Sequence, residues 1–341
     1  MLLSIIIPAF NCEKSIERTV NSIISSGLRD YEIIIINDGS TDDTESICKN
    51  LCSRYSLIKY HEQENEGVSA ARNMGITLSA AEYIMFFDAD DTAKENGFSE
   101  CVDIIRNEKP DMLVFGMSFD YYKNGKCYRR DELAPEQSGL LDKSQIRENL
   151  ESLYNTNSLT PVWNKFFKRS LINDNNISFN TNYHLMEDFL FSLECLRVCE
   201  NIYCFPKALY QYKQSENEKN AFNRLDRIED LCEYTAPFKK ALEALNAGEV
   251  ANKVFNNFFF MLLYQKMYYL NKKELKALIE GLNSNSLFSE FKQSEVSSMY
   301  MGLLKDIKEF RYIKIRFLNL KTQLRHRVAV FVKSIVGSIK N

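Results

Sequence analysis

The chain has 341 residues, of which 45% are hydrophobic and 26% charged, a composition typical of a folded globular protein and unlike disordered, collagen-like or repeat chains. Its net charge of −3 is uneven: residues 311–341 carry eight Lys or Arg and no Asp or Glu, while the remainder carries 35 Lys or Arg against 46 Asp or Glu. An acidic body with a basic tail indicates an anionic surface as a partner.

Predicted strands and helices alternate through the first 120 residues. Apolar, β-branched runs predict strands over residues 3–8, 32–37, 57–61, 83–87 and 112–119. Between them, helical spacing predicts helices over residues 15–26, 68–78 and 97–107, and another that is capped by Thr41 or Asp42 and reaches Tyr55. Continuous apolar strands separated by helices are typical of a mostly parallel sheet with helices on both faces. We therefore expect an α/β fold.

The pattern changes beyond residue 120. Residues 120–139 are polar and irregular, with a hairpin turn predicted at Asn124 and Gly125. Helices are predicted over residues 143–154, 187–199, 225–245, 251–269 and 273–282, and the aromatic residues of 255–269 have the spacing of a helix-packing core. Three regions are therefore expected: an α/β domain over 1–220, a helical region over 221–310, and a basic tail over 311–341.

The tail has the pattern of an amphipathic helix. Its apolar residues recur at steps of three and four: Ile313, Phe317, Leu320, Leu324, Val328, Phe331 and Ile335. Such a helix can lie in a membrane interface, where each cation gains about 1 kcal/mol from anionic lipid. The alternative is a helix docked on the protein's own core. Nucleic acid is a weaker interpretation of the charge, because the sequence contains no recognisable nucleic-acid-binding module.

Cysteine content and hydropathy bear on the compartment. Nine cysteines, an odd number in a chain of this length, do not resemble a disulfide scaffold, and buried thiols imply a reducing compartment. The pairs Cys48/Cys52 and Cys195/Cys199 have helical spacing, unlike most structural zinc sites. Residues 1–3 lead directly into a strand without a signal peptide, and no segment approaches the roughly 18 apolar residues of a transmembrane helix. We expect a cytoplasmic protein, peripheral at the inner face of the cell membrane.

Three carboxylates follow the predicted strand at residues 83–87: Asp88, Asp90 and Asp91. Open α/β sheets bind their ligands at the carboxyl ends of the strands. Asp88 and Asp90 lie two residues apart, so in extended chain they can point the same way and offer oxygen ligands to Mg²⁺ or Mn²⁺. Their predicted use is to hold the cation against the phosphates of a substrate. A solvated Asp-rich turn is the alternative.

Four motifs at the ends of predicted strands carry a family resemblance. They are SIIIPAFN (residues 4–11), NDGSTDDT (37–44), NEGVSAARN (65–73) and DADD (88–91). In this order and spacing the chain resembles the family-2 inverting glycosyltransferases with the GT-A fold, of the bacterial capsule and exopolysaccharide type. The resemblance is strong over about the first 100 residues and looser to about residue 215.

The resemblance implies a nucleotide-sugar site. It assigns this role to nine positions: Pro8, Phe10, Asp38, Asn65, Gly67, Arg72, Asp88, Ala89 and Asp90. Asp38 is implied to accept a hydrogen bond from a pyrimidine imide N–H, although an Asp before glycine also forms turns. Arg72 is implied to reach the pyrophosphate or to orient the carboxylates, whereas an arginine considered alone would be a solvated helix cation.

The resemblance also implies a divalent metal, Mn²⁺ or Mg²⁺. Asp90 is the expected direct ligand, with Asp88 on the ribose or a metal-bound water and Asp91 supporting the turn. A cation bridging two phosphate oxygens would stabilise the departing diphosphate by several kcal/mol.

Inversion needs one general base for the acceptor hydroxyl. The family supplies it from a Glu-Asp pair, which implies Asp188 as base and Glu187 as reserve. Adjacent acids at a helix start are also ordinary N-terminal residues. Met186 stands where relatives often carry glycine, so a slight backbone difference is expected there.

Trp163, Asn164 and Lys165 are expected to wall the acceptor and donor-sugar side of the cleft. A lone Trp suits sugar stacking and a buried core equally well.

The predicted function is transfer of a hexosyl unit from a nucleoside diphosphate sugar, expected to be a UDP-sugar, to a glycan or lipid-linked acceptor in surface polysaccharide synthesis. A sugar-nucleotide-binding scaffold without turnover is the non-enzymatic alternative. A sugar-nucleotide pyrophosphorylase or a dinucleotide-binding dehydrogenase would need a glycine-rich loop after the first strand, where residues 8–13 contain no glycine.

Overall fold

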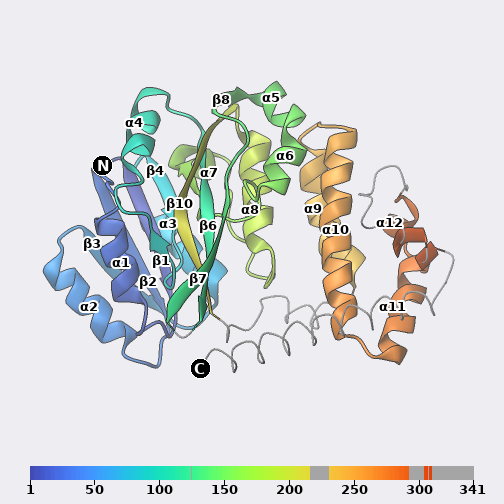
Figure 1. Cartoon of the computed structure of the whole chain (residues 1–341), viewed down its shortest axis with the longest axis horizontal. Helices are drawn as coiled ribbons and strands as arrows, with labels where there is room; N and C mark the ends of the chain where they lie inside the picture. Colours follow the sequence, from blue (N-terminus) through green and yellow to red (C-terminus); the bar gives the residue numbers. More distant parts are fainter. Residues whose placement is uncertain (124, 216–229, 292–302, 306, 309–341) are drawn as a thin grey trace. The chain divides into compact units, whose positions relative to one another are not determined.

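The computed structural model describes residues 1–123, 125–215, 230–291, 303–305 and 307–308 (Figure 1). These residues fall into two compact units. The first contains the described residues up to 215 together with Ala244–Ala247, and the second contains the rest. The predicted boundary at residues 220 and 221 and the predicted tail at 311–341 lie outside the described residues, so both stay predictions.

The described strands of the first unit form one mixed sheet. Its order is β3-β2-β1-β4-β9-β6-β10-β5, with β7 paired to β6 and β8 to β10. Parallel pairing joins β3, β2, β1 and β4, and also β6 and β10, while β5, β7, β8 and β9 pair antiparallel with their neighbours. The strand bounds are β1 (Leu3–Ala9), β2 (Tyr31–Asp38), β3 (Ile58–Gln63), β4 (Tyr83–Phe86), β5 (Thr92–Ala93), β6 (Met112–Lys123), β7 (Lys126–Leu133), β8 (Gly139–Asp142), β9 (Lys165–Lys168) and β10 (Asn201–Ser215).

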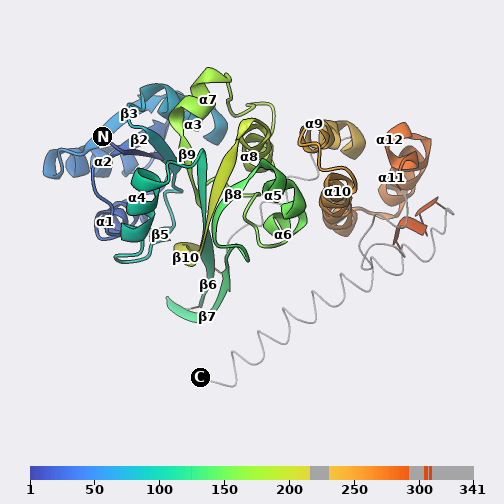
Figure 2. The ribbon, with the colours of Figure 1, turned by 90° about the horizontal axis from the view of Figure 1, so that it is seen from above.

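Helices cover both faces of this sheet, as expected. The helices of the first unit are α1 (Ile16–Ile24), α2 (Thr44–Arg54), α3 (Val68–Leu78), α4 (Ser99–Asn107), α5 (Lys143–Glu148), α6 (Leu150–Asn155), α7 (Arg169–Asp174) and α8 (Glu187–Val198). Figure 2 shows α1 and α4 on one side of the sheet and α3 and α7 on the other. The predicted α/β architecture is therefore confirmed.

Strand β2 shows how the two layers form. Ile33 and Ile35 belong to the core cluster that also contains the buried side chains of α1, α2 and α4, whereas Ile34 and Ile36 pack with Ala71 of α3. Successive residues of a strand point to opposite faces, so four consecutive isoleucines bury both faces at once. This burial fixes the carboxyl end of the strand, where Asp38 lies.

Helix α3 approaches β1 closely. A Cβ added to Gly75 would lie 2.2 Å from Cγ2 of Ile6, a distance that no side chain tolerates. Glycine at this position therefore lets α3 lie against the strand, and this approach sets the depth from which Arg72 extends.

Several predicted elements need correction. Helix α2 begins at Thr44 after Asp43, although the Asp42 carboxylate does accept the Thr44 N–H at 3.0 Å. The segment 120–139 is not irregular, because β6 extends to Lys123, β7 and β8 follow, and Lys123 pairs with Lys126 across the predicted hairpin. The predicted helix over 143–154 is two short helices that meet at Asn149. Strands β9 and β10 were not predicted.

The second unit is helical in its described part. It contains α9 (Leu231–Glu243), α10 (Glu249–Tyr269), α11 (Lys272–Ser284) and α12 (Ser286–Ser289). The aromatic stripe of α10 is core, as predicted: its buried members are Phe255, Phe258, Phe259 and Phe260. Among the helices that the structure describes, none is both long and apolar enough to cross a membrane.

Candidate functional site

The loops after β1 and β2 are tied together at one edge of the sheet. The Asn11 carboxamide oxygen accepts the Thr41 N–H at 2.8 Å, and the Asn11 N–H donates to the Ser40 hydroxyl at 3.0 Å. Next to these bonds, Pro8 is half-buried and the Phe10 side chain is 50% exposed. The two residues predicted at the exit of the first strand therefore lie on an ordered rim.

Asp38 lies at the end of β2 and is only 4% exposed. Its Oδ1 accepts hydrogen bonds from the Gln63 side chain at 2.8 Å and from the Glu66 N–H at 2.9 Å, and its Oδ2 accepts the Gly67 N–H at 2.9 Å. The carboxylate thus holds the loop of residues 65–67, where Gly67 has a positive φ of 92°. Sequence reasoning did not find this positioning contact, and the base contact of Asp38 stays a prediction.

Gly39 brings the same loop close to β2. Its φ is 68°, and a Cβ at this position would lie 2.9 Å from the backbone nitrogen of Asn65. Only glycine meets both conditions without strain. Asn65 and Gly67 are therefore held beside Asp38, and their predicted role in nucleotide binding stays a prediction.

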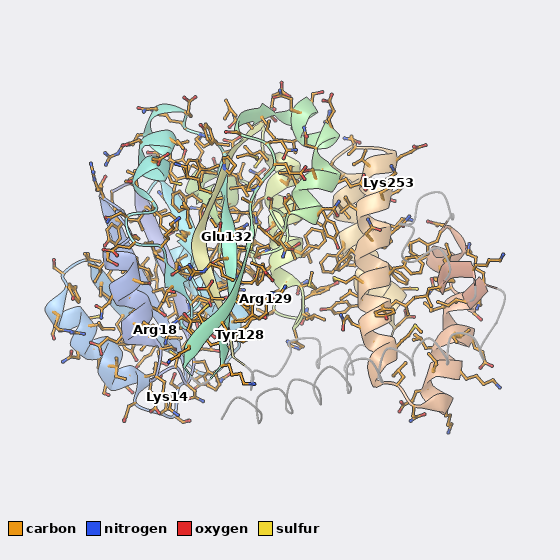
Figure 3. All side chains as sticks on the ribbon, viewed as in Figure 1. Lys14, Arg18, Tyr128, Arg129, Glu132 and Lys253 are labelled. Atoms are coloured by element: carbon orange, nitrogen blue, oxygen red, sulfur yellow. The ribbon has the colours of Figure 1, made fainter. Side chains whose placement is uncertain are left out.

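Helix α1 holds the aspartate loop that follows β4. The buried Thr19 hydroxyl lies 3.0 Å from the Ala89 carbonyl oxygen and 2.7 Å from that of Asp91. Nearby, the Arg18 guanidinium donates to the Asp90 carbonyl oxygen at 2.8 Å. Figure 3 labels Arg18 among the side chains of the first unit. These contacts fix the backbone of the loop, and the Asp90 side chain is exposed.

Asp91 supports this turn from below, in agreement with the prediction. Its buried carboxylate accepts the Tyr210 hydroxyl at 2.6 Å and the Lys213 N–H at 2.8 Å, and the Asp88 N–H donates to the Tyr210 oxygen at 3.2 Å. Burial, together with the charges of Asp88 and Asp90, raises the pKa of the Asp91 carboxyl well above its ordinary value. Tyr210 therefore links β10 to the loop, a role that the sequence did not reveal.

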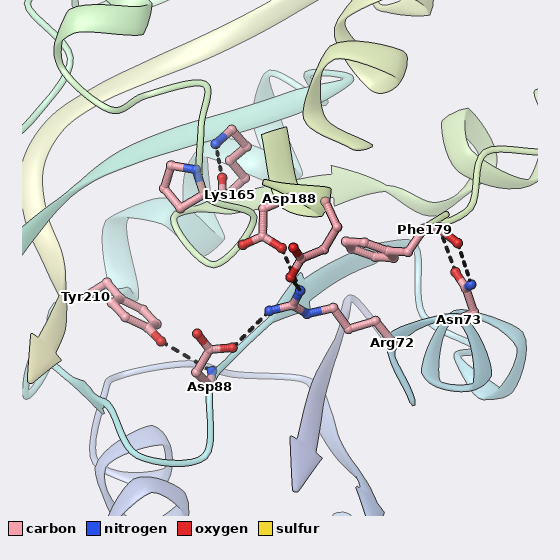
Figure 4. Close-up of polar contacts among 9 residues, drawn as sticks. Arg72, Asn73, Asp88, Lys165, Phe179, Asp188 and Tyr210 are labelled. Carbon is pink, nitrogen blue, oxygen red and sulfur yellow. Dashed lines mark hydrogen bonds and ion pairs between the residues drawn. The ribbon is translucent and has the colours of Figure 1, made fainter. Parts of the chain in front are cut away.

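Arg72 of α3 joins the two halves of the site. Its side chain is 4% exposed, and its guanidinium lies 3.1 Å from Oδ1 of Asp88, 2.5 Å from Oδ1 of Asp188 and 3.5 Å from Oε1 of Glu187 (Figure 4). The alternative of a solvated helix cation is therefore wrong. The planar guanidinium fork suits several carboxylates at once and orients Asp88 and Asp188 toward a common centre.

A second layer of contacts holds Arg72. Its guanidinium lies 5.3 Å from the ring centroid of Phe179, which stacks on Phe191 at 4.0 Å. The Asn73 carboxamide in turn donates to the Phe179 carbonyl at 2.9 Å and accepts the Phe179 N–H at 2.8 Å (Figure 4). Asn73 and Phe179 were missed, because they lie 106 positions apart in the sequence and no local pattern reports the contact.

Helix α8 presents the acid pair at its first turn. Met186 precedes the helix with φ 62° and ψ 19°, the left-handed conformation that glycine adopts without strain. The backbone at Met186 therefore has a conformation for which glycine is suited, and the predicted difference from relatives stays a prediction. Glu187 and Asp188 follow as the first two helical residues, near Arg72.

The environment of Asp188 changes its acidity. Burial raises the pKa of the Asp188 carboxyl to about 7; Arg72 opposes this rise, and the nearby Glu187 and Asp88 carboxylates reinforce it. A carboxyl that titrates near neutrality can hold or release a proton under ordinary conditions, which is the property of a general base.

The residues predicted to wall the acceptor pocket are buried. Trp163 is 7% exposed and stacks on Tyr210 with ring centroids 4.2 Å apart. Lys165 is fully buried; its ammonium donates to the Pro161 carbonyl and, at 2.7 Å, to the Asn164 side chain. Burial lowers the pKa of Lys165 to about 7. The structure therefore places these residues under the site, and Trp163 fits the core alternative.

The oxygen ligands available here suit a cation that arrives with a diphosphate. The Asp88 side chain is 28% exposed, and Asp90 is exposed on the same loop. Within the described part of the chain, no group of three or more His, Cys, Asp or Glu side chains could hold a metal. Mg²⁺ is commonly bound by one or two carboxylates plus substrate phosphates, and these residues fit that arrangement.

Comparisons with known proteins agree with this geometry. The model of the family described as "Glycosyl transferase family 2" matches residues 4–174. The chain is 31% identical over 218 residues to "Uncharacterized glycosyltransferase EpsJ" of Bacillus subtilis, which covers 63% of this chain and 62% of EpsJ. It is also 31% identical over 228 residues to "Poly(ribitol-phosphate) beta-N-acetylglucosaminyltransferase TarP" of Staphylococcus aureus, which covers 65% of each chain. The chain thus spans less than two thirds of either relative.

A solved structure shares the fold. The crystal structure of S. aureus TarS 1-349 in complex with UDP-GlcNAc superposes with a TM-score of 0.68 at 19% identity, covering 95% of this chain and 92% of that one. The predicted GT-A architecture is therefore confirmed. Together with the family match over half of the chain, it supports one conclusion: the chain belongs to glycosyl transferase family 2.

Proposed function

We propose that this chain is an inverting glycosyltransferase that moves a hexosyl unit from a UDP-sugar to a hydroxyl of a glycan or lipid-linked acceptor in surface polysaccharide synthesis. Family membership supports the reaction class. The names of two similar proteins support the donor and the setting, since TarS is described in complex with UDP-GlcNAc and TarP is named for a poly(ribitol-phosphate) acceptor.

The observation that carries the proposal is the bridge that Arg72 makes between Asp88 and Asp188. Asp88 belongs to the loop suited to a metal-bound diphosphate. The pKa of the Asp188 carboxyl, about 7, suits a general base. The buried guanidinium of Arg72 contacts both carboxylates, so the leaving group and the attacking hydroxyl would meet at a single centre. A scaffold that only bound nucleotide would have no need of a base at this distance.

The donor side follows from the loop geometry. The nucleotide would lie on the rim formed by Pro8 and Phe10, and a pyrimidine imide N–H would be a further donor to Asp38. Asp38 already orders the loop that carries Asn65 and Gly67. The same carboxylate would therefore shape the pocket and accept a hydrogen bond from the nucleotide base. Gly67 has no side chain, so the nucleotide could approach the backbone closely at this position.

A divalent cation, Mn²⁺ or Mg²⁺, would be held by Asp90 and Asp88. When bound, it would stabilise the negative charge that develops on the departing diphosphate, typically by several kcal/mol. Arg72 keeps Asp88 oriented toward the loop, while Thr19 and Arg18 hold the loop backbone still. A loop and a carboxylate that are already held in place do not have to rearrange during the reaction.

The acceptor side rests on Asp188. In the transfer, the acceptor oxygen bonds to the anomeric carbon, the bond from that carbon to the diphosphate breaks, and the hydroxyl proton passes to the Asp188 carboxylate. Its pKa near 7 matches that task. Glu187 is the reserve candidate, because its carboxylate lies against the same guanidinium. Attack from the face opposite the leaving group inverts the anomeric centre.

The test is Mn²⁺-dependent release of UDP from a panel of UDP-sugars by the full chain, with Asp188→Asn and Asp90→Asn as comparisons. We expect release with at least one donor, a loss of at least 100-fold in Asp188→Asn, and retention of donor binding in that variant. Nucleotide binding without release from any donor would instead be the behaviour of the scaffold.

We also propose that residues 311–341 bring the enzyme to an anionic membrane surface. This proposal rests on the sequence alone, since these residues lie outside the described part of the chain. Co-sedimentation with vesicles containing phosphatidylglycerol tests it. Binding should fall when the chain ends at Glu309, and undiminished binding would remove the tail from this role.

A further inference from the structure

A buried lysine lies behind the proposed base. Lys165, the first residue of β9, is fully buried, and burial lowers the pKa of its ammonium while the nearby Asp188 and Cys195 raise it. Asp188 and Cys195 stand about two turns apart on α8, so both lie on the same face of that helix. In the view of Figure 4, Asp188 lies between Arg72 and Lys165. A second basic side chain besides Arg72 therefore approaches Asp188.

Lys165 fastens the segment of residues 161–164 that precedes it. Its ammonium donates to the Pro161 carbonyl and, at 2.7 Å, to Oδ1 of Asn164. The Asn164 carboxamide in turn donates to the Asn157 carbonyl at 3.2 Å, and the backbone carbonyl of Asn164 accepts an N–H of β6 at 3.0 Å. Both ends of the segment are therefore held, and it cannot shift without breaking the buried hydrogen bonds of the ammonium.

The middle of this segment touches the proposed base. Val162 is fully buried; burial raises the pKa of the Asp188 carboxyl, and a hydrogen bond from the Val162 N–H counteracts this rise. Charged groups from four parts of the fold surround the same carboxylate: Arg72 of α3, Asp88 of the aspartate loop, Glu187 of α8 and Lys165 of β9. The two cations favour an ionised Asp188, and the two carboxylates oppose it. Lys165 therefore favours the ionised base both through the segment that it fastens and through its charge.

From these contacts we infer that Lys165 is a positioning residue for Asp188: it fastens residues 161–164 so that the Val162 N–H meets the carboxylate, and it sets a positive charge behind that carboxylate. The inference rests on the proposed function, because it concerns the general base of that reaction. An alkyl side chain of the same length would fill the space without the cost of burying a charge. It would make neither hydrogen bond of the ammonium, so Asp188 would hold its proton more tightly.

Lys165→Met tests the inference in the full chain without any donor, because methionine is an adaptable side chain that fills the space without a charge. Carbon NMR of the chain labelled at its aspartate carboxyls follows proton binding by Asp188, whose signal is the one missing from Asp188→Asn. We expect the midpoint of this titration to rise by about one pH unit in Lys165→Met, since a cation is lost and an N–H donor is released. An unchanged or lower midpoint would overturn the inference.

Two further variants separate positioning from a general effect of losing a lysine. Lys168→Met is the matched control, because Lys168 lies on the same strand, points to the opposite face and pairs with Asp111 at 3.4 Å. It should leave the midpoint of Asp188 unchanged, and a shift as large as that of Lys165→Met would overturn the inference. Asn164→Ala keeps the ammonium but loosens the segment, so the midpoint should rise here too. An unchanged midpoint in Asn164→Ala would show that the segment does not position the carboxylate, and this variant decides the question if Lys165→Met does not fold.

Kinetics give a second readout once a donor is turned over. Lys165→Met should lower kcat for UDP release about fivefold at pH 7, regain most of the loss at pH 9 and leave the KM of the donor within about twofold, because a base with a raised pKa is ionised only at higher pH. A lysine with a purely structural role would lower kcat by the same factor at every pH, and that result would contradict the inference. The NMR titration needs neither donor nor turnover. A failure of the proposed function would therefore show as absent UDP release, and a failure of this inference as an unshifted midpoint of Asp188.

Discussion

The carboxamide of Asn73 pairs with both backbone polar groups of Phe179, donating to the carbonyl at 2.9 Å and accepting the N–H at 2.8 Å. This contact joins α3 to the segment that precedes α8, and it sets the ring of Phe179 under the guanidinium of Arg72. Asn73 therefore acts on the site through its neighbour, and the position of Arg72 depends on a residue that touches neither proposed substrate.

Replacement of Asn73 by Ala should lower both stability and turnover. Loss of the two hydrogen bonds should reduce the free energy of unfolding by about 1–3 kcal/mol. A freer Phe179 ring should let Arg72 shift, so kcat for UDP release should fall by about tenfold while the KM of the donor changes little. Urea unfolding and steady-state kinetics measure the two effects.

Asn175→Ala is the matched control, because the Asn175 side chain also donates to a backbone carbonyl, that of Leu171 at 2.9 Å. It should lower stability and leave kcat within twofold. If Asn73→Ala loses stability while its kcat stays at the control level, Phe179 does not position Arg72.

Arg72→Lys should damage the site although it keeps the charge. A lysine ammonium cannot reproduce the guanidinium fork that contacts Asp88, Glu187 and Asp188 together. We expect kcat to fall by about 100-fold and the free energy of unfolding by about 3 kcal/mol, since buried carboxylates lose a partner. Activity near that of the unmodified chain would show that a point charge is enough and that the bridge has no special role.

The raised pKa of Asp188 predicts a pH dependence of activity. A base must be deprotonated, so UDP release should rise with pH through about 7 and level off above it. Asp188→Asn should remove this rise together with most activity, and Glu187→Gln should keep it. A profile of kcat against pH that is flat from 5 to 9 would argue against Asp188 as the base.

The same shift predicts how stability depends on pH. The folded-state pKa is higher than that of an unfolded aspartate, so between about pH 4 and 7 the folded chain binds the extra proton and this contribution to stability is lost as pH rises. Asp188→Asn lacks the titration. Its stability relative to the unmodified chain should therefore be lowest near pH 4 and should increase toward pH 8 in urea unfolding.

Met186 should tolerate glycine better than a β-branched residue. Its left-handed backbone is strained for methionine, so Met186→Gly should raise the free energy of unfolding by up to about 1 kcal/mol, whereas Met186→Val should lower it by about 1 kcal/mol or more. Thermal unfolding of both variants compares them. A loss of stability on introducing glycine would mean that the contacts of the Met186 side chain outweigh the strain.

Sequence reasoning reached the parts of the fold that depend on local patterns. The isoleucines of β1 and β2 are buried on both faces, and such runs are recognisable without a structure. Strand β10 was missed because it contains Pro206 and a polar second half, and its pairing with β6 stabilises it from outside the segment. The hairpin turn and most of β6 were predicted, yet β7 was not, because its exposed residues lack apolar alternation.

In the candidate site too, the parts that depend on local motifs could be predicted and the parts that depend on distant contacts could not. The aspartates and Arg72 stand in motifs, so their proximity could be predicted. The support of Asp91 by Tyr210 and of Arg72 by Phe179 joins residues more than 100 positions apart, and no local pattern reports such contacts. Trp163 shows the limit most clearly, because its burial against Tyr210 depends on a strand that the sequence did not predict.

The most direct test of the central claim is a crystal structure of the full chain with UDP and Mn²⁺. We predict that the cation lies between the diphosphate and the carboxylates of Asp88 and Asp90, that the uracil lies against Asp38, and that Arg72 still contacts Asp188. UDP and Mn²⁺ bound away from this edge of the sheet, or a cation that contacts neither Asp88 nor Asp90, would contradict it.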